Sequence, residues 1–140
     1  MPPAIRKIVE TSLYVKSLEQ SEKFYTDVLG LEVVSRKEGR HVFIKAGRNM
    51  LLLFDPVGLR REREKLGEKA IPQVYELGRT HIAFEINDED MARWKQTLKK
   101  KRVPIEFVRD WPTGNHSYYF RDPDMNVIEL ITPGSWPIND

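Results

Sequence analysis

The sequence contains no cysteine among its 140 residues. This absence excludes disulfides, thiolate zinc sites and cysteine nucleophiles, and it is typical of a reducing compartment. Long apolar runs are also absent, because the longest, MLLLF at 50–54, is far shorter than a membrane span. The first residues, MPPAIRKIVE, do not contain the apolar segment that a signal peptide needs. We therefore expect a cytoplasmic protein with no membrane partner.

The chain also has no strong excess of charge of one sign, since 23 basic and 21 acidic residues give a net charge of +2. The pI near 8.8 therefore does not indicate nucleic acid as a partner. The basic run KKKR at 99–102 ends a predicted helix, where cations complement the helix dipole and stay solvated. The length, with 40% hydrophobic and 31% charged residues, is typical of one compact domain.

An internal repeat organises the chain. The segment ETSLYVK, from Glu10, can be placed over HIAFEIN, from His81, so that apolar positions coincide. Both segments alternate between apolar and polar residues, as strands with one buried face do. Each is followed by a predicted helix and then by three short extended segments, which gives the order βαβββ twice. We place module one at about 6–56, a connector at about 57–78 and module two at about 79–134 of one domain.

Local signals mark both predicted helices. In the first, Ser17 and Gln20 have the spacing of a capping box, and Gly30 has the position of a helix stop. The second is predicted over 88–102, with Asp88 as its cap. The charged connector is predicted to be a short amphipathic helix, a mobile lid or a solvated link between the modules.

The closing strands of the two modules differ at one informative position. Placing NMLLLF over NVIELI puts Leu52 over Glu129. A carboxylate inside an apolar strand is costly to bury unless it is paired or bound to a metal. Glu10 and His81 occupy corresponding places on the opening strands, so three of these four positions carry residue types that bind metals.

These segments resemble the vicinal oxygen chelate superfamily, which includes glyoxalase I, bleomycin-resistance proteins, fosfomycin-resistance thiol transferases, methylmalonyl-CoA epimerase and extradiol dioxygenases. The resemblance covers nearly the whole chain. It implies an α+β fold in which two βαβββ modules form a curled mixed sheet around a cavity that holds a divalent cation. Three segments carry it: ETSLYVKSLEQSEKFYTDVLGLEV, GRTHIAFEI and YFRDPDMNVIEL.

The resemblance also implies a set of metal ligands from the first and last strands of each module. Glu10 takes the first ligand position, where many members have histidine, His81 takes the third and Glu129 the fourth. Leu52 occupies the second position, where glyoxalase-like members carry a donor, so open coordination positions remain for a substrate. One imidazole and two carboxylates suit Mn²⁺, Fe²⁺, Zn²⁺, Ni²⁺ or Mg²⁺ without selecting among them.

Two further residues are catalytic candidates, His116 and Tyr119. Tyr119 precedes Glu129 in a Tyr-x-x-Asp-Pro pattern similar to part of the extradiol dioxygenase signature, where such a tyrosine lies over the metal. The signature is incomplete, and an aromatic residue packed inside the curved sheet explains Tyr119 equally well. Aromatic walls with a few polar groups are typical of small-molecule pockets. The candidates for such a wall are Tyr14, Phe43, Trp111 and His116.

The expected function is that of a metal-dependent enzyme acting on a small oxygenated molecule. Bidentate chelation and stabilisation of an enolate or oxyanion suit an isomerase, a lyase, a thiol transferase or a dioxygenase. The alternative is a non-catalytic drug- or metabolite-binding protein of the bleomycin-resistance type. The resemblance further implies a homodimer, in which Glu10 of one chain meets His81 and Glu129 of the other.

Overall fold

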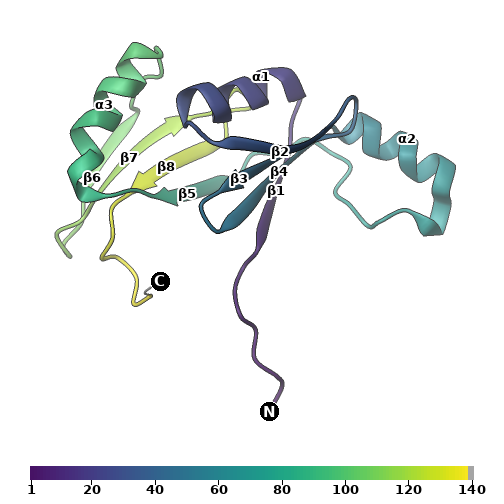
Figure 1. The fold of residues 1–140 in the computed structure, drawn as a ribbon, viewed down its shortest axis with the longest axis horizontal. Coiled ribbons are helices and arrows are strands. Elements are labelled where there is room, and N and C mark those ends of the chain that lie inside the picture. The colour runs from purple at the N-terminus through teal and green to yellow at the C-terminus, as the bar shows by residue number, and fades with distance from the viewer. Residues whose placement is uncertain (139–140) are drawn as a thin grey trace. The chain divides into compact units, whose positions relative to one another are not determined.

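The computed structural model describes residues 1–138 and divides into two compact units, Met1–Gly78 and Arg79–Asp140 (Figure 1). Each unit contains one four-stranded mixed sheet with its own helices. Each sheet is open, with a free edge strand on either side. The predicted fold class, α+β with two βαβββ modules, is therefore confirmed.

The first unit contains two helices and four strands. Its helices are α1 (Leu18–Lys23), which continues as a π-helical turn over Phe24–Val28, and α2 (Pro56–Leu66), which is followed by the 3₁₀ turn Gly67–Lys69. Its strands are β1 (Glu10–Tyr14), β2 (Glu32–Lys37), β3 (His41–Ala46) and β4 (Asn49–Phe54). They lie in the order β1-β4-β3-β2, with β1 parallel to β4 and the other pairs antiparallel.

The second unit repeats this arrangement. Its 3₁₀ turn Asp88–Asp90 leads into helix α3 (Met91–Lys100). Its strands are β5 (His81–Glu85), β6 (Phe107–Asp110), β7 (His116–Arg121) and β8 (Val127–Ile131). They lie in the order β5-β8-β7-β6, and β5 is parallel to β8.

The register of the two sheets confirms the internal repeat. Glu10 lies opposite Met50 of β4, and His81 lies opposite Val127 of β8. Met50 and Val127 each follow the asparagine that aligns the closing strands. The two opening strands therefore place Glu10 and His81 at equivalent points, each within its own sheet.

Helix α1 contacts β3 and β4 of the first sheet. It begins where the Ser17 hydroxyl accepts a hydrogen bond of 3.2 Å from the Gln20 N–H, as the capping pattern predicts. The chain turns away at Gly30, whose φ of +71° is a conformation that glycine adopts without strain. The apolar residues buried in this unit include Leu13, Val15, Tyr25, Ile44, Leu51 and Leu53.

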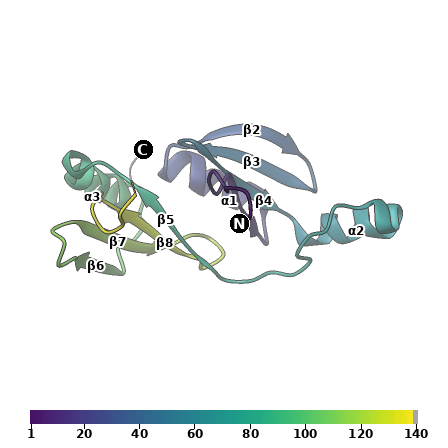
Figure 2. The same ribbon diagram turned by 90° about the horizontal axis from the view of Figure 1, so that it is seen from below.

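The first half of the predicted connector forms helix α2, as the amphipathic-helix alternative predicts, while residues 71–78 form no helix or strand (Figure 2). Asp55 caps the helix by accepting a hydrogen bond of 2.9 Å from the Val57 N–H. Leu59 is 1% exposed and packs against the apolar end of β4. A Cβ on Gly58 would lie 1.8 Å from the Gly39 carbonyl oxygen, so only glycine lets the helix approach the β2–β3 turn this closely.

Helix α3 begins later than the sequence predicts. The expected cap, Asp88, is wrong: a 3₁₀ turn, closed by the 3.0 Å hydrogen bond from the Asp90 N–H to the Asn87 carbonyl, precedes the helix. Asp90 takes the capping position without a side-chain cap, and its carboxylate pairs with Arg93 at 3.2 Å. Leu98 is the fully buried residue of this helix.

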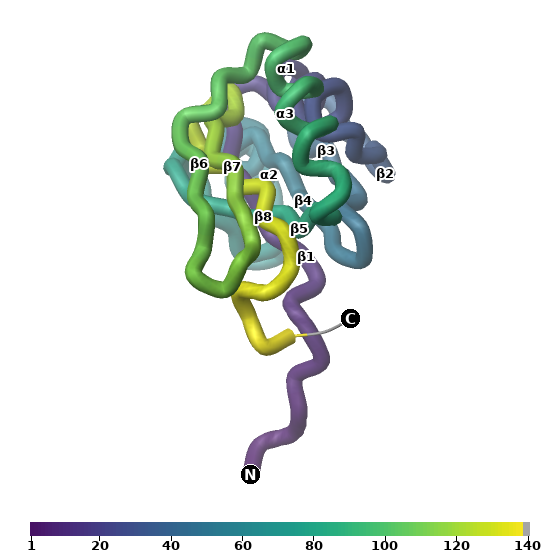
Figure 3. The backbone as a smooth tube through the Cα atoms, turned by 90° about the vertical axis from the view of Figure 1, so that its left-hand side faces the viewer, coloured from purple at the N-terminus to yellow at the C-terminus, as the bar shows by residue number. Residues whose placement is uncertain are grey.

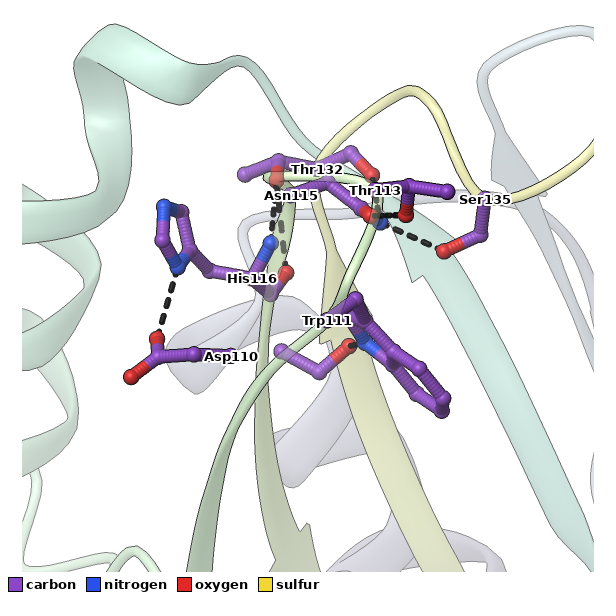
Figure 4. A network of polar contacts seen from close by, with 8 residues as sticks. Asp110, Trp111, Thr113, Asn115, His116, Thr132 and Ser135 are labelled. Carbon is purple, nitrogen blue, oxygen red and sulfur yellow. Dashed lines mark hydrogen bonds and ion pairs between the residues drawn. The ribbon is translucent and has the colours of Figure 1, made fainter.

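The β6–β7 hairpin is fixed to the end of β8 (Figures 3 and 4). The buried Asn115 side chain donates hydrogen bonds to the Thr132 carbonyl at 3.0 Å and to the Ser135 hydroxyl at 2.6 Å. The Asn115 carbonyl in turn accepts a hydrogen bond of 2.9 Å from the Trp111 N–H. This turn therefore fixes the backbone from which the Trp111 indole projects. Among residues 1–138, no helix has the length and apolar character needed to cross a membrane.

Candidate functional site

The centre of the candidate site is the pair His81 and Glu129. Because His81 lies opposite Val127 in the parallel register, Glu129, two residues further along β8, projects from the same face of the sheet. His81 Nε2 and Glu129 Oε1 are 3.0 Å apart. Glu129 is 5% exposed, while half of the His81 side chain is open to solvent. The second unit thus brings together two of the three predicted ligands.

The other ring nitrogen of His81 determines whether a cation must lie between His81 and Glu129. His81 Nδ1 lies 3.0 Å from the Val127 carbonyl oxygen, which can only accept a hydrogen bond. Nδ1 must therefore carry a hydrogen, and in a neutral ring Nε2 then directs a lone pair at the Glu129 carboxylate. Two acceptors at this distance repel each other unless a cation, either a proton or a metal ion, lies between them.

The geometry of this pair fits a divalent cation. Ligands about 2.1 Å from one ion and at right angles to each other are about 3.0 Å apart, which matches the separation of Nε2 and Oε1. A histidine that donates Nδ1–H to a backbone carbonyl has the orientation usual for a metal ligand. Within residues 1–138, no group of three or more His, Asp or Glu side chains is assembled for a metal. A complete site therefore needs a donor from outside this pair.

Glu10, the third predicted ligand, is exposed on β1 of the first unit. Its position in the sheet register corresponds to that of His81. The residue that corresponds to Glu129 is Leu52, which is 9% exposed and belongs to an apolar cluster. Glu10 therefore has no carboxylate neighbour at that position of its own sheet, and its role as a ligand stays a prediction.

Besides His81, Ser117 and Tyr119 are neighbours of Glu129, and Trp111 reaches it through Ser117. The Ser117 hydroxyl donates a hydrogen bond of 2.6 Å to Glu129 Oε2, and the Trp111 indole N–H donates one of 2.9 Å to the Ser117 oxygen. Tyr119 lies directly opposite Glu129 in the β7–β8 register. Burial, followed by the neighbouring carboxylate of Glu129, raises the pKa of Tyr119. Tyr119 is consequently a protonated hydrogen-bond donor at neutral pH rather than a base.

A hollow of about 570 Å³ opens on this face of the second unit. Arg109 lies over the Trp111 ring at 4.9 Å, a cation–π contact that holds a positive charge at the hollow. Sequence reasoning identified Trp111 and Tyr119 but missed Arg109. Ser117 lies two residues before Tyr119 on the same face of β7, and Arg109 lies opposite Ser117 on β6. Counting alternate residues along this hairpin would therefore have identified Arg109. The lining residues are Glu106, Phe107, Arg109, Trp111, Tyr119 and Val127.

The remaining candidates lie elsewhere. Alternation along β7 places His116 on the opposite face from Ser117 and Tyr119, and its Nδ1 pairs with Asp110 at 2.7 Å (Figure 4). A catalytic role for His116 therefore stays a prediction. Tyr14 and Phe43, predicted as cavity walls, pack in the first unit against the apolar cluster of Leu52, Phe54 and Leu59.

Comparisons with known proteins agree with this fold and site. The sequence model of the Glyoxalase/Bleomycin resistance protein/Dioxygenase superfamily matches residues 7–130. The chain belongs to this family, as the resemblance to the vicinal oxygen chelate superfamily predicted. The predicted class, a metal-dependent enzyme of this superfamily, is confirmed.

Three relatives narrow the comparison. The structure of a lactoylglutathione lyase from Agrobacterium tumefaciens is 37% identical, with a TM-score of 0.83, and the match covers 99% of this chain and 100% of that one. A metallothiol transferase FosB from Staphylococcus haemolyticus is 30% identical over 91% of this chain and 84% of its own length. A lactoylglutathione lyase from Pseudomonas putida is 26% identical over 94% of this chain and 88% of its own length.

Proposed function

We propose that the protein makes or breaks a carbon–sulfur bond on a small oxygenated substrate, with a divalent cation held by His81 and Glu129. The observation that carries this proposal is the approach of His81 Nε2 to Glu129 Oε1, 3.0 Å apart, on the face where the hollow opens. The relatives named as metallothiol transferase and lactoylglutathione lyase support the choice of reaction, because both names describe chemistry on thiol compounds.

The chain's own residues have distinct parts in this proposal. His81 and Glu129 hold the cation, which polarises a substrate oxygen when it is bound. Tyr119, kept protonated by its surroundings, donates a hydrogen bond from the ring that lies opposite Glu129. Arg109 offers a positive charge to an anionic group of the substrate or of the thiol. Phe107 and Trp111 form the apolar wall against which the carbon skeleton packs.

The third ligand in this proposal is Glu10, from the same chain or from a second copy in a homodimer. Its support is the matched register, since Glu10 and His81 are the first residues of equivalent strands. The identity of the cation stays open among Mn²⁺, Fe²⁺, Zn²⁺, Ni²⁺ and Mg²⁺, because carboxylate and imidazole donors accept all of them. A cytoplasmic homodimer completes the proposal.

The test combines metal analysis with an assay for free thiol. Purified protein is loaded with each cation in turn, and metal content is measured after gel filtration together with the mass of the assembly. Consumption of a small thiol with an epoxide reports transfer, and release of free thiol together with a 2-oxoaldehyde from a 2-hydroxyacyl thioester reports lyase activity. We expect one cation per chain and turnover that a chelator abolishes. Glu129→Gln should remove both, while Glu89→Gln, an exposed glutamate of the same unit, should remove neither.

The rival, a protein that binds a drug or metabolite without reaction, has one observation in its favour. Leu52 and its apolar neighbours occupy the face of the first unit where a donor would stand. Tight binding of an apolar ligand by a preparation that takes up no cation would support this rival. It would also contradict the enzyme proposal.

A further inference from the structure

Glu129 is oriented by a chain of two hydrogen bonds that begins at Trp111. The Trp111 indole nitrogen lies 2.9 Å from the Ser117 hydroxyl oxygen, and that oxygen lies 2.6 Å from Glu129 Oε2. Ser117 is fully buried, and Glu129 is 5% exposed. Neither side chain can exchange its partner for bulk water without opening the sheet.

The direction of both bonds follows from the chemistry of the groups. An indole N–H is a donor only, so the Ser117 oxygen must accept its hydrogen bond. A hydroxyl has a single hydrogen, and the carboxylate is an acceptor, so this hydrogen goes to Glu129 Oε2. The chain therefore has one arrangement, in which Trp111 donates to Ser117 and Ser117 donates to Glu129 (Figure 4 shows the Trp111 end).

We propose that Trp111 and Ser117 are positioning residues that reserve a single oxygen of Glu129, Oε1, for the cation. This inference rests on the proposed function, because it concerns the cation that His81 and Glu129 hold. With Oε2 accepting the Ser117 hydrogen, Oε1 faces His81 Nε2 at 3.0 Å, and the Tyr119 hydroxyl is a further hydrogen-bond partner of the carboxylate. Outer partners of this kind fix the orientation of a ligating carboxylate.

The two hydrogen bonds that connect Trp111 through Ser117 to Glu129 are called the relay below. The relay also reaches the hollow, because the Trp111 ring lines it. Arg109, on β6 two residues before Trp111, lies over the same ring at 4.9 Å. A substrate that packs on Trp111 therefore touches the first member of a chain that ends at the metal ligand. The relay connects the wall of the hollow with the orientation of Glu129.

Metal affinity is the first readout. The dissociation constant for Zn²⁺ is measured by competition with a chromogenic chelator, which does not depend on activity. We expect Ser117→Ala to weaken binding about 10–100-fold, the range typical of lost outer partners. Trp111→Phe keeps an aromatic ring but removes the donor, and it should weaken binding about fivefold, as expected for one neutral hydrogen bond. The matched control is Trp136→Phe, a 72% exposed tryptophan of the same unit, which should bind as the wild type does.

Coupling between the two variants separates a relay from two independent contacts. If Trp111 acts through Ser117, then Trp111→Phe should have almost no further effect in the Ser117→Ala background. Effects that multiply in the double variant would overturn the relay. This cycle also compares proteins of similar fold, so a general loss of stability does not imitate the expected result.

The indole N–H resonance of Trp111 gives a spectroscopic signature. It is assigned by its disappearance in Trp111→Phe, and Zn²⁺ is chosen because it is diamagnetic. We expect this resonance to shift on metal binding in the wild type and to stay in place in Ser117→Ala. The Trp136 resonance should not move in either protein.

The outcomes distinguish the relay from the proposed function. If the wild type binds no cation, the proposed function fails and the relay fails with it. If the wild type and Ser117→Ala bind cation equally well, or if the Trp111 resonance ignores the metal, the relay alone is overturned. Weaker binding in Ser117→Ala together with a lost resonance shift supports it.

Discussion

The two units share one strand order and one register, yet the faces that carry the candidate site are chemically opposite. In the second unit Tyr119 lies opposite Glu129, and in the first unit Phe43 lies opposite Leu52 at the same place. The second face is therefore polar and hollowed, whereas the first is apolar. Side chains account for this difference, since the pairings that place these residues correspond in both units and the extra β-bulge of the first unit lies in the β2–β3 pair, between Val33 and Ser35.

The first unit also covers its apolar face with its own chain. Leu59 of α2 belongs to one cluster with Leu52 and Phe54, and Tyr75 of the segment that follows packs against this cluster. The Tyr14 hydroxyl donates a hydrogen bond of 3.0 Å to the Gln73 side chain, which fixes the same segment to β1. The second unit is followed by no equivalent helix among its described residues 79–138.

The two faces of each sheet are under different physical constraints. The face toward α1 or α3 must be apolar in both units because it forms the core. The other face is free to become a sealed surface or a site, and a few substitutions decide which. Four predictions test how far this contrast reaches.

The largest effect is expected from removing either member of the ligand pair. His81→Ala and Glu129→Gln should each weaken metal binding by more than about 100-fold, beyond the loss that outer partners cause. Metal content after gel filtration measures it. His116→Ala is informative beside them: full retention of metal would separate this histidine, paired with Asp110, from the ligand pair. If Glu129→Gln bound as much metal as the wild type, Glu129 would not be a ligand, and the polar face of the second unit would not be distinguished from the apolar face of the first by a metal site.

Exchanging the key residues of the two faces should give unequal costs. Leu52→Glu places a carboxylate in an apolar cluster with no partner, and we expect it to lower the free energy of unfolding by about 3 kcal/mol. Glu129→Leu should cost clearly less, because it removes a buried charge and replaces it with an apolar side chain of similar size. Urea unfolding at neutral pH without added metal measures both. Equal costs would mean that the first face is not sealed.

The cover of the first unit should depend on one glycine. Replacing a helical glycine by alanine usually stabilises a protein. Gly58→Ala should instead destabilise it by about 2 kcal/mol, because the added Cβ would meet the Gly39 carbonyl oxygen at 1.8 Å. Gly78→Ala, where the Cβ meets nothing within 4 Å, is the matched control and should change little. A stabilising Gly58→Ala would show that α2 does not pack closely on the β2–β3 turn.

The smallest effect is a pH dependence that His41 of the first unit contributes. His41 accepts a hydrogen bond from Arg40 at Nδ1, 2.7 Å long, so its ring is held neutral, and Nε2 lies 3.1 Å from the Ser35 hydroxyl. Burial, then the positive charges of Arg40 and Lys37, lower the pKa of His41, while Glu62 opposes them.

The sign of this pH effect follows from the lowered pKa. The stabilisation from neutral His41 is fully present above the ordinary histidine pKa of about 6.5 and is lost as pH falls from there toward the lower pKa of the folded state. Unfolding by urea at pH 7.5 and at pH 5.5 should therefore show lower stability at the acidic pH. His41→Asn should reduce that difference, and an unchanged difference would contradict this assignment.

Much of the fold could be predicted from the sequence because the signals are local or repeated. Alternation in ETSLYVK and HIAFEIN fixed the strand faces, and the Ser17 cap and the Gly30 stop bounded α1. The Asp88 cap was wrong because a 3₁₀ turn and an α-helix begin with the same residue types, and only the backbone distinguishes them. The packing of α2 and the following segment on the apolar face of the first unit was not predictable, since no periodicity or motif at Leu59 or Tyr75 indicates which residues they contact.

Part of the candidate site was likewise predictable from the sequence, and part was not. His81 and Glu129 were predicted from the repeat and the resemblance, and they meet because parallel pairing brings residues 48 positions apart onto one face. Arg109 and the Trp111–Ser117 link were missed, because hydrogen-bond direction and ring contacts depend on three-dimensional placement. The role of Glu10 depends on how modules assemble, which no pattern within one strand encodes.

A crystal structure of the protein loaded with Mn²⁺, with the ion located by its anomalous scattering, would show directly whether His81 and Glu129 hold the cation. We expect one ion per chain, within about 2.3 Å of both His81 Nε2 and Glu129 Oε1, with Glu10 of the same or a second copy as its third protein ligand. An ion bound elsewhere, or one that contacts His81 without Glu129, would contradict it.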